Sequence, residues 1–201
     1  NGKLNLGSYN LTLGGSVSGV SSARYVVATT GELRKTFSAN GSFAYPVGDA
    51  SNYSPVTINV TAGTFSGAYV SAKVTNTAHP NLLSLTDYIT RYWTIGGVGI
   101  TNPTYAIDCY YVDADVNGTE ANLSLGRWDG SIWLIEGLSD PVNNKLSGVS
   151  LTSFSDFTGA NPAALPVQLA SFVGNFVGNS VNLEWQTISE VNNFGFNVQR
   201  F

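Results

Sequence analysis

Short alternating segments between turn-forming residues are the feature that most restricts the fold of this chain. Apolar residues alternate with polar ones over 56–60 and 68–74, which is the period of a half-buried strand. Gly, Asn-Gly or Ser-Gly interrupts almost every stretch before a helical period could build. The sequence therefore predicts an all-β protein whose short strands are separated by frequent turns.

The order of these segments predicts how the chain is divided. We expect an antiparallel β-sandwich of the immunoglobulin or jelly-roll kind over residues 1–158, with Trp93 as a core anchor. A Pro- and Ala-rich linker is expected over 159–166. The remaining residues, 167–201, contain three candidate strands, which are too few to bury two sheet faces by themselves.

Two Leu-x-Leu pairs open the sequence. Leu4 and Leu6 are separated from Leu11 and Leu13 by a segment that contains Gly7-Ser8. The pattern fits a hairpin, and it equally fits two rungs of a stack. A further alternative is that these residues form the last coil of a β-solenoid.

Composition favours an extracellular β-protein. Charged residues make up only 11% of the chain, against about 25% in ordinary soluble domains, so Ser, Thr, Asn and Gly must cover much of the surface. The aromatic content of 12% argues against disorder. No apolar run approaches the roughly 18 residues of a membrane helix, so no transmembrane segment is expected.

The charges are unevenly distributed along the chain. Residues 1–100 carry six basic and three acidic side chains, whereas residues 101–201 carry three basic and ten acidic ones. No basic stripe indicates a nucleic-acid partner. Opposite charges on the two halves favour head-to-tail contacts between copies, although acids in solvated loops explain the same distribution.

Catalytic residue types are sparse. His79 is the single histidine; it precedes Pro80 in a polar loop, and no Gly-x-Ser-x-Gly elbow is present. Cys109 is the single cysteine, which excludes an internal disulfide, and its strand-like surroundings indicate a buried core residue. We therefore expect a protein that is not an enzyme and needs no cofactor.

Two constellations nevertheless suggest ligands. Asp113, Asp115 and Asn117 match the first half of a calcium loop, but the position of the final Glu is held by Ser124. An Asp- and Asn-rich turn explains the same residues without a metal. Trp128 and Trp133 flank an Asp-Gly turn and could stack on sugar rings of a glycan, or pack across strands in the core.

The C-terminal part of the chain resembles a known family. Segments 151–158, 165–172, 179–187 and 190–200 read LTSFSDFT, LPVQLASF, NSVNLEWQT and EVNNFGFNVQR. This series resembles a segment common in large secreted surface proteins of Bacteroidetes, Ignavibacteria and related bacteria. In that family the segment opens a fibronectin type III-like module, and a type IX secretion sorting domain often follows.

The resemblance implies export and an extracellular or cell-surface location, and it implies no catalytic residues. It also implies that the fibronectin type III-like strand set is incomplete, because the module normally continues past Arg200. The missing strands would then come from elsewhere, with 159–166 as the hinge.

We therefore expect a non-enzymatic structural protein of the bacterial surface. It would form a fibre or surface layer with other copies of itself, by strand exchange or complementation. The alternative is a carbohydrate-binding or adhesive module of a larger secreted protein. The residues expected to mediate assembly lie in the tail and in the N-terminal Leu pairs: Val167, Leu169, Phe172, Val181, Leu183, Trp185, Phe194, Phe196, Val198, Leu4, Leu6, Leu11 and Leu13.

Overall fold

Strands make up most of the computed structural model, which describes residues 2–82, 86–162, 168–178 and 180–189. The helical elements in this part are two single 3-10 turns, η1 (Asp113–Asp115) and η2 (Glu120–Asn122). The expected all-β, sandwich-like fold with antiparallel sheets is confirmed. Among the described residues, no helix has the length and apolar character needed to cross a membrane.

Two long paired strands lie at the centre of the main sheet. β7 (Val56–Thr75) and β8 (Tyr88–Tyr110) pair antiparallel from Val56 opposite Cys109 to Thr75 opposite Tyr92. β7 covers both segments, 56–60 and 68–74, that the sequence predicted as separate strands. The pairing of β7 with β8 shifts register at several points but continues to the end of both strands. Gly63 and Gly67 lie in this irregular part of β7, and both adopt positive φ.

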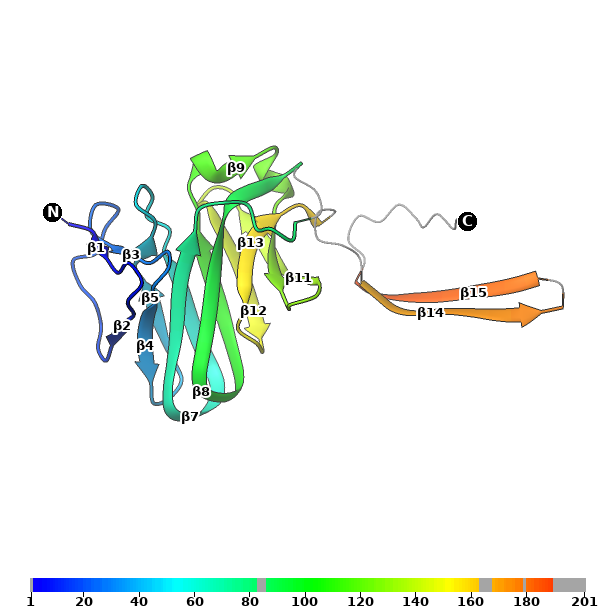
Figure 1. Cartoon of the computed structure of the whole chain (residues 1–201), viewed down its shortest axis with the longest axis horizontal. Coiled ribbons are helices and arrows are strands. Elements are labelled where there is room, and N and C mark those ends of the chain that lie inside the picture. The colour runs from blue at the N-terminus through cyan, green and yellow to red at the C-terminus, as the bar shows by residue number, and fades with distance from the viewer. Residues whose placement is uncertain (1, 83–85, 163–167, 179, 190–201) are drawn as a thin grey trace.

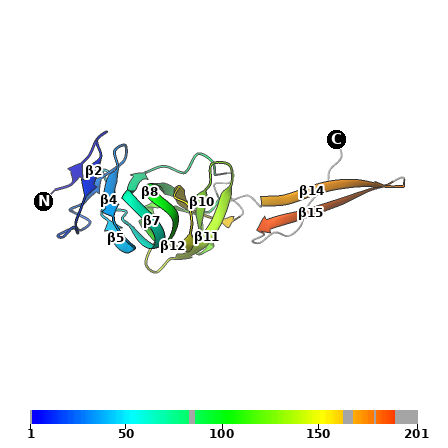
Figure 2. The same ribbon diagram turned by 90° about the horizontal axis from the view of Figure 1, so that it is seen from below.

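Four more strands continue the sheet from β8, and all of them pair antiparallel with their neighbours. They are, in spatial order from β8, β13 (Asp156–Ala160), β10 (Ser124–Trp128), β11 (Trp133–Asp140) and β12 (Lys145–Leu151). The last of them, β12, also pairs with the end of β8, so the sheet curls back on itself. Figure 2 shows these strands arranged around a common interior.

Two further short strands of this sheet lie at the ends of β7 and β8. β5 (Gly41–Tyr45) pairs with the first part of β7, and β9 (Val116–Asn117) pairs with the start of β8. The enclosed core includes Trp93, as the sequence predicted; its ring is fully buried and its Nε1 donates to the carbonyl of Ser54 at 2.9 Å. Cys109 is buried in the same core, and burial raises the pKa of its thiol well above the ordinary value.

The N-terminal segments stack in parallel. β1 (Leu4–Asn5) pairs with β3 (Val26–Val27), which pairs with β6 (Val47–Gly48); separately, β2 (Leu11–Leu13) pairs with β4 (Leu33–Phe37). β1 and β2 do not pair with each other, so neither a hairpin nor two rungs of one stack describes the Leu-x-Leu pairs; each pair instead lies beside a later strand. The chain turns at Gly7, whose φ is 55°, so β1 and β2 join different sheets.

The end of the sandwich lies slightly beyond the expected boundary. Gly159 and Ala160 belong to β13 and are buried, so the linker cannot begin before Asn161. After residues 163–167, β14 (Gln168–Val177) and β15 (Ser180–Ser189) form an antiparallel hairpin, drawn in orange in Figure 1. The third expected strand, 194–198, lies outside the described residues.

Candidate assembly site

The β14–β15 hairpin has one apolar face. Phe172 is opposite Trp185, Gly174 is opposite Leu183, and Phe176 is opposite Val181. Directly paired residues point to the same side of a sheet, and so do residues two apart. All six positions therefore share one face, which we call the hairpin face.

The opposite side of the hairpin is largely polar. It carries Ser171, Asn175, Asn182 and Glu184, with Val173 as the apolar exception among its described side chains. The sequence alternates in this way because strands of a two-layered protein are apolar only toward the core. The hairpin is thus built as one half of a sandwich.

The hairpin face is exposed. Phe176 is 87% exposed and Phe172 60% exposed, whereas Val181 is 51% and Trp185 39% exposed. In the described part of the chain, β14 and β15 form a two-stranded sheet of their own. Such a hairpin is marginally stable in water, so burial of this face against another surface would be favourable.

The structure places the predicted assembly residues in two separate regions. Phe172, Val181, Leu183 and Trp185 share the hairpin face, to which Phe176 is added; the prediction had omitted it. Val167, Phe194, Phe196 and Val198 lie outside the described residues, and Leu169 belongs to β14 without a described side chain. At the N-terminus, Leu4, Leu11 and Leu13 lie in β1 and β2, whereas Leu6 is buried.

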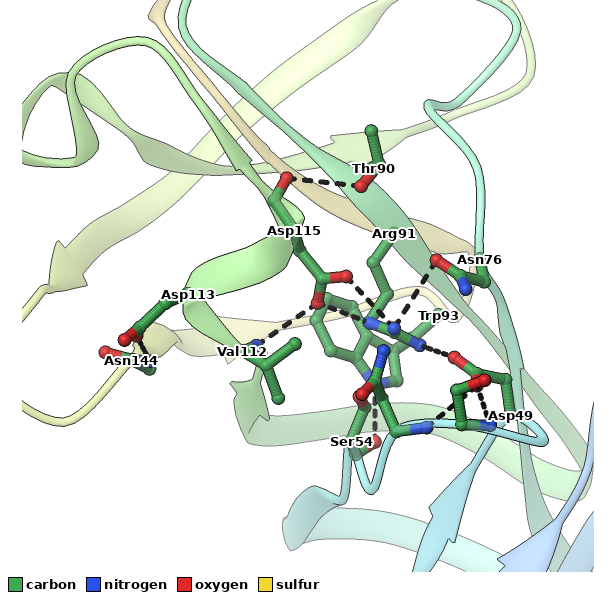
Figure 3. A network of polar contacts seen from close by, with 12 residues as sticks. Asp49, Ser54, Asn76, Thr90, Arg91, Trp93, Val112, Asp113, Asp115 and Asn144 are labelled. Atoms are coloured by element: carbon green, nitrogen blue, oxygen red, sulfur yellow. Dashed lines mark hydrogen bonds and ion pairs between the residues drawn. The ribbon is translucent and has the colours of Figure 1, made fainter.

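A buried charge network lies at the start of β8 (Figure 3). Arg91 is fully buried and binds Asp115 with two hydrogen bonds, from Nε at 2.6 Å and from Nη2 at 3.0 Å. Its Nη1 donates to Asp49 at 2.7 Å, and Nη2 lies 3.5 Å from the side-chain oxygen of Asn76. Sequence reasoning missed Arg91, although alternation through Ile89 and Trp93 places it on the inward face of its strand.

Asp49 is held in its charged form. Burial raises the pKa of its carboxyl, but hydrogen bonds from the amides of Asn52 and Ser51 and the pairing with Arg91 outweigh that effect. The pKa therefore lies below its ordinary value. The network joins the loop after β6 and the η1 turn to β8, which is a structural role.

The residues predicted to bind calcium have other partners. The carboxylate of Asp115 is used by Arg91 and the amide of Val112, whereas Asp113 accepts a hydrogen bond from Asn144. The side chain of Asn117 donates to the carbonyl of Asp115. No group of three or more His, Cys, Asp or Glu in the described ranges could hold a metal ion.

His79 lies in a second buried cluster. Its Nε2 is 3.3 Å from Asp156 Oδ2, and its Nδ1 accepts from the amide of Asn81 at 3.2 Å. Both ring nitrogens therefore have hydrogen-bond partners within the cluster. Burial raises the pKa of Asp156, but the hydrogen bond to His79 and other contacts hold it below its ordinary value.

The two tryptophans predicted as a sugar platform pack around this histidine. The Trp133 ring is 2% exposed, lies 4.8 Å from the His79 ring, and donates through Nε1 to the carbonyl of Asn81. Trp128 is half-buried, with its ring centroid 5.4 Å from that of Trp133. A stacking platform needs an exposed flat face, which Trp133 does not offer.

Comparisons with known proteins add no assignment to this geometry. Protein-family models, curated protein sequences and solved structures were searched, and none of them matches the chain. Any function must therefore be argued from the residues and their arrangement.

Proposed function

We propose that this chain is a non-enzymatic structural protein of the extracellular bacterial surface that assembles with other copies of itself through the hairpin face. The observation that supports this function is the apolar face of β14–β15, on which Phe172 and Phe176 are more than half exposed. Low charge content and the resemblance of segments 151–200 to secreted surface proteins support the location.

The second copy is the partner that fits this face best. A surface that is apolar along its whole length can pack against an identical surface across a two-fold axis. Two stacked hairpins would form a small two-layered sandwich with sheets about 10 Å apart. The opposite net charges of residues 1–100 and 101–201 further favour contacts between copies over mutual repulsion.

Light scattering coupled to size-exclusion chromatography tests this proposal. The 201-residue chain is expected to show a monomer–dimer equilibrium that shifts toward the dimer as concentration rises, because association across the two-fold axis buries both hairpin faces. Replacing Phe176 and Trp185 together by Ser should return the protein to a monomer. The matched control, Asn175→Ser with Asn182→Ser, changes the opposite face of the same strands and should leave association unchanged.

A protein that stays monomeric at the highest soluble concentration would overturn self-assembly and assign the hairpin face to a different partner. Equal loss of association in both double variants would also contradict the proposal, because it would show that the effect is not specific to the apolar face.

A further inference from the structure

The N-terminal strands repeat at intervals of 21 or 22 residues along the chain. Leu4 pairs with Val26 and Leu11 pairs with Leu33, so both ladders have a spacing of 22 residues, from 4 to 26 and from 11 to 33. The next step, from Val26 to Val47, is 21 residues. Successive parallel strands at a fixed interval are the signature of stacked β-coils.

The backbone bonds between coils also repeat. The amide of Leu4 donates to the carbonyl of Tyr25, and the amide of Val26 donates to the carbonyl of Pro46. At the corner of the coil, the amide of Gly31 donates to the carbonyl of Gly7 at 2.8 Å. The backbone of each coil is thus hydrogen-bonded to the backbone of the next coil.

Burial falls steadily toward the first coil. Val47 is fully buried, Val26 is half-buried, and Leu4, which occupies the equivalent place in the first coil, is 53% exposed. In the second ladder, Leu33 is fully buried, whereas Leu11 is half-buried. An outermost coil that ends a stack carries a polar outer face, but this one presents leucines.

The edge of the first coil is open as well. β1 is the end strand of its three-stranded sheet, and β2 is an end strand of the ten-stranded sheet, which it joins through the pairing of β4 with β7. A mainly apolar hollow of about 310 Å³ runs along the coils: its lining includes Leu4, Leu11 and Leu13 of the first coil, and also Val26 and Pro46 of the coils that follow. The first coil therefore combines unpaired strand edges with exposed aliphatic side chains, a combination that favours pairing with a further strand.

We infer that β1 and β2 are the docking edge for a further parallel β-coil of the same polypeptide, which carries aliphatic residues 22 positions before Leu4 and before Leu11. The existing ladders support this occupant, because every parallel neighbour in them lies one coil away along the same chain. A second copy related by a two-fold axis would place β1 antiparallel to its mate and break the stack. The inference does not depend on the hairpin proposal.

A tandem extension of the 201-residue chain tests this inference. A copy of residues 4–25 is placed directly before Leu4 (replacing residues 1–3), which sets the added leucines 22 positions before Leu4, Leu11 and Leu13. Amide hydrogen exchange is then measured in the original 4–13 segment. We expect protection there to rise at least about tenfold, because the segment changes from a terminal coil to an internal one.

The control extension has the same length, with the copies of Leu4, Leu11 and Leu13 replaced by Lys. It should give no added protection. The inference is overturned if the leucine extension leaves exchange unchanged, or if both extensions protect equally. It is also overturned if the unextended Phe176→Ser, Trp185→Ser chain dimerises and Leu4→Lys abolishes that dimer, since the edge would then belong to a second copy.

Discussion

Arg91 connects two loops to β8 by charge rather than by apolar contact. Its guanidinium is fully buried between Asp49 and Asp115, and each carboxylate comes from a different loop. A buried ion whose partner is removed keeps its desolvation penalty and loses the compensating attraction. The stability of this region should therefore depend on each acid separately.

Asp115→Asn is expected to reduce the free energy of unfolding by about 3 kcal/mol, because it leaves the buried Arg91 with one carboxylate. Urea denaturation at neutral pH measures the change. Asp113→Asn is the matched control: this neighbour is exposed in the same turn, so its effect should stay within about 0.5 kcal/mol. Equal losses in the two variants would refute the structural role of the ion pair.

The hydrogen bonds of Asp87 predict that the stability of the fold decreases at acid pH. Its carboxylate accepts hydrogen bonds from the amide of Thr119 at 2.7 Å and from the side chains of Asn122 and Asn161 at 2.9 and 3.0 Å. These bonds, with that from Thr119 the strongest influence, hold the pKa of Asp87 below its ordinary value of 3.8. The group is thus more acidic in the folded state than in the unfolded state.

The stabilisation from Asp87 is therefore complete above pH 3.8 and is lost as the pH falls through the folded-state pKa. Unfolding midpoints in urea, followed from pH 6 to pH 2.5, should decline below about pH 4. In Asp87→Asn the decline should be shallower, because that position no longer titrates. An identical pH profile in the two proteins would show that Asp87 contributes nothing to acid sensitivity.

At the scale of elements, alternation locates strands better than it locates their partners. It indicated much of β7, at 56–60 and 68–74, because one face of these segments is buried. It left open whether 4–13 formed a hairpin or rungs, since pairing direction depends on residues more than twenty positions away. The partners of Arg91 could not be predicted from the sequence for the same reason, because they lie 24 and 42 residues away along the chain.

Gly31 tests how the coils are held together. A Cβ at this position would overlap the backbone carbonyl of Tyr9 in the neighbouring coil, and a backbone obstacle cannot turn aside as a side chain can. Gly31→Ala should therefore separate the first coil from the second and increase amide exchange in β1 and β2. Gly14→Ala, where the added methyl group meets open space, is the control and should exchange as the unchanged protein does.

At the scale of the whole molecule, the sandwich and the hairpin have different physical roles. The buried apolar residues of the described chain run from Leu6 to Ala160, so the core is complete before the hairpin begins. The sequence indicated this division, because the tail has too few strands to enclose a core. It did not show which side of the tail is apolar, since that depends on the register between β14 and β15.

A chain that ends at Pro162 should therefore fold, because it keeps the whole core of the sandwich. Its thermal midpoint should stay within about 2 °C of that of the full chain, which corresponds to a loss of less than about 1 kcal/mol for a domain of this size. It should also lose the concentration-dependent association of the full chain. A chain that ends at Ser155 is the control: it lacks β13, whose Phe157 is fully buried between β8 and β10, and should fail to fold cooperatively. Calorimetry and light scattering on the three proteins separate the two roles.

If the chain ending at Pro162 melts far below the full chain, the hairpin stabilises the sandwich itself. Its apolar face would then pack within the molecule instead of mediating assembly.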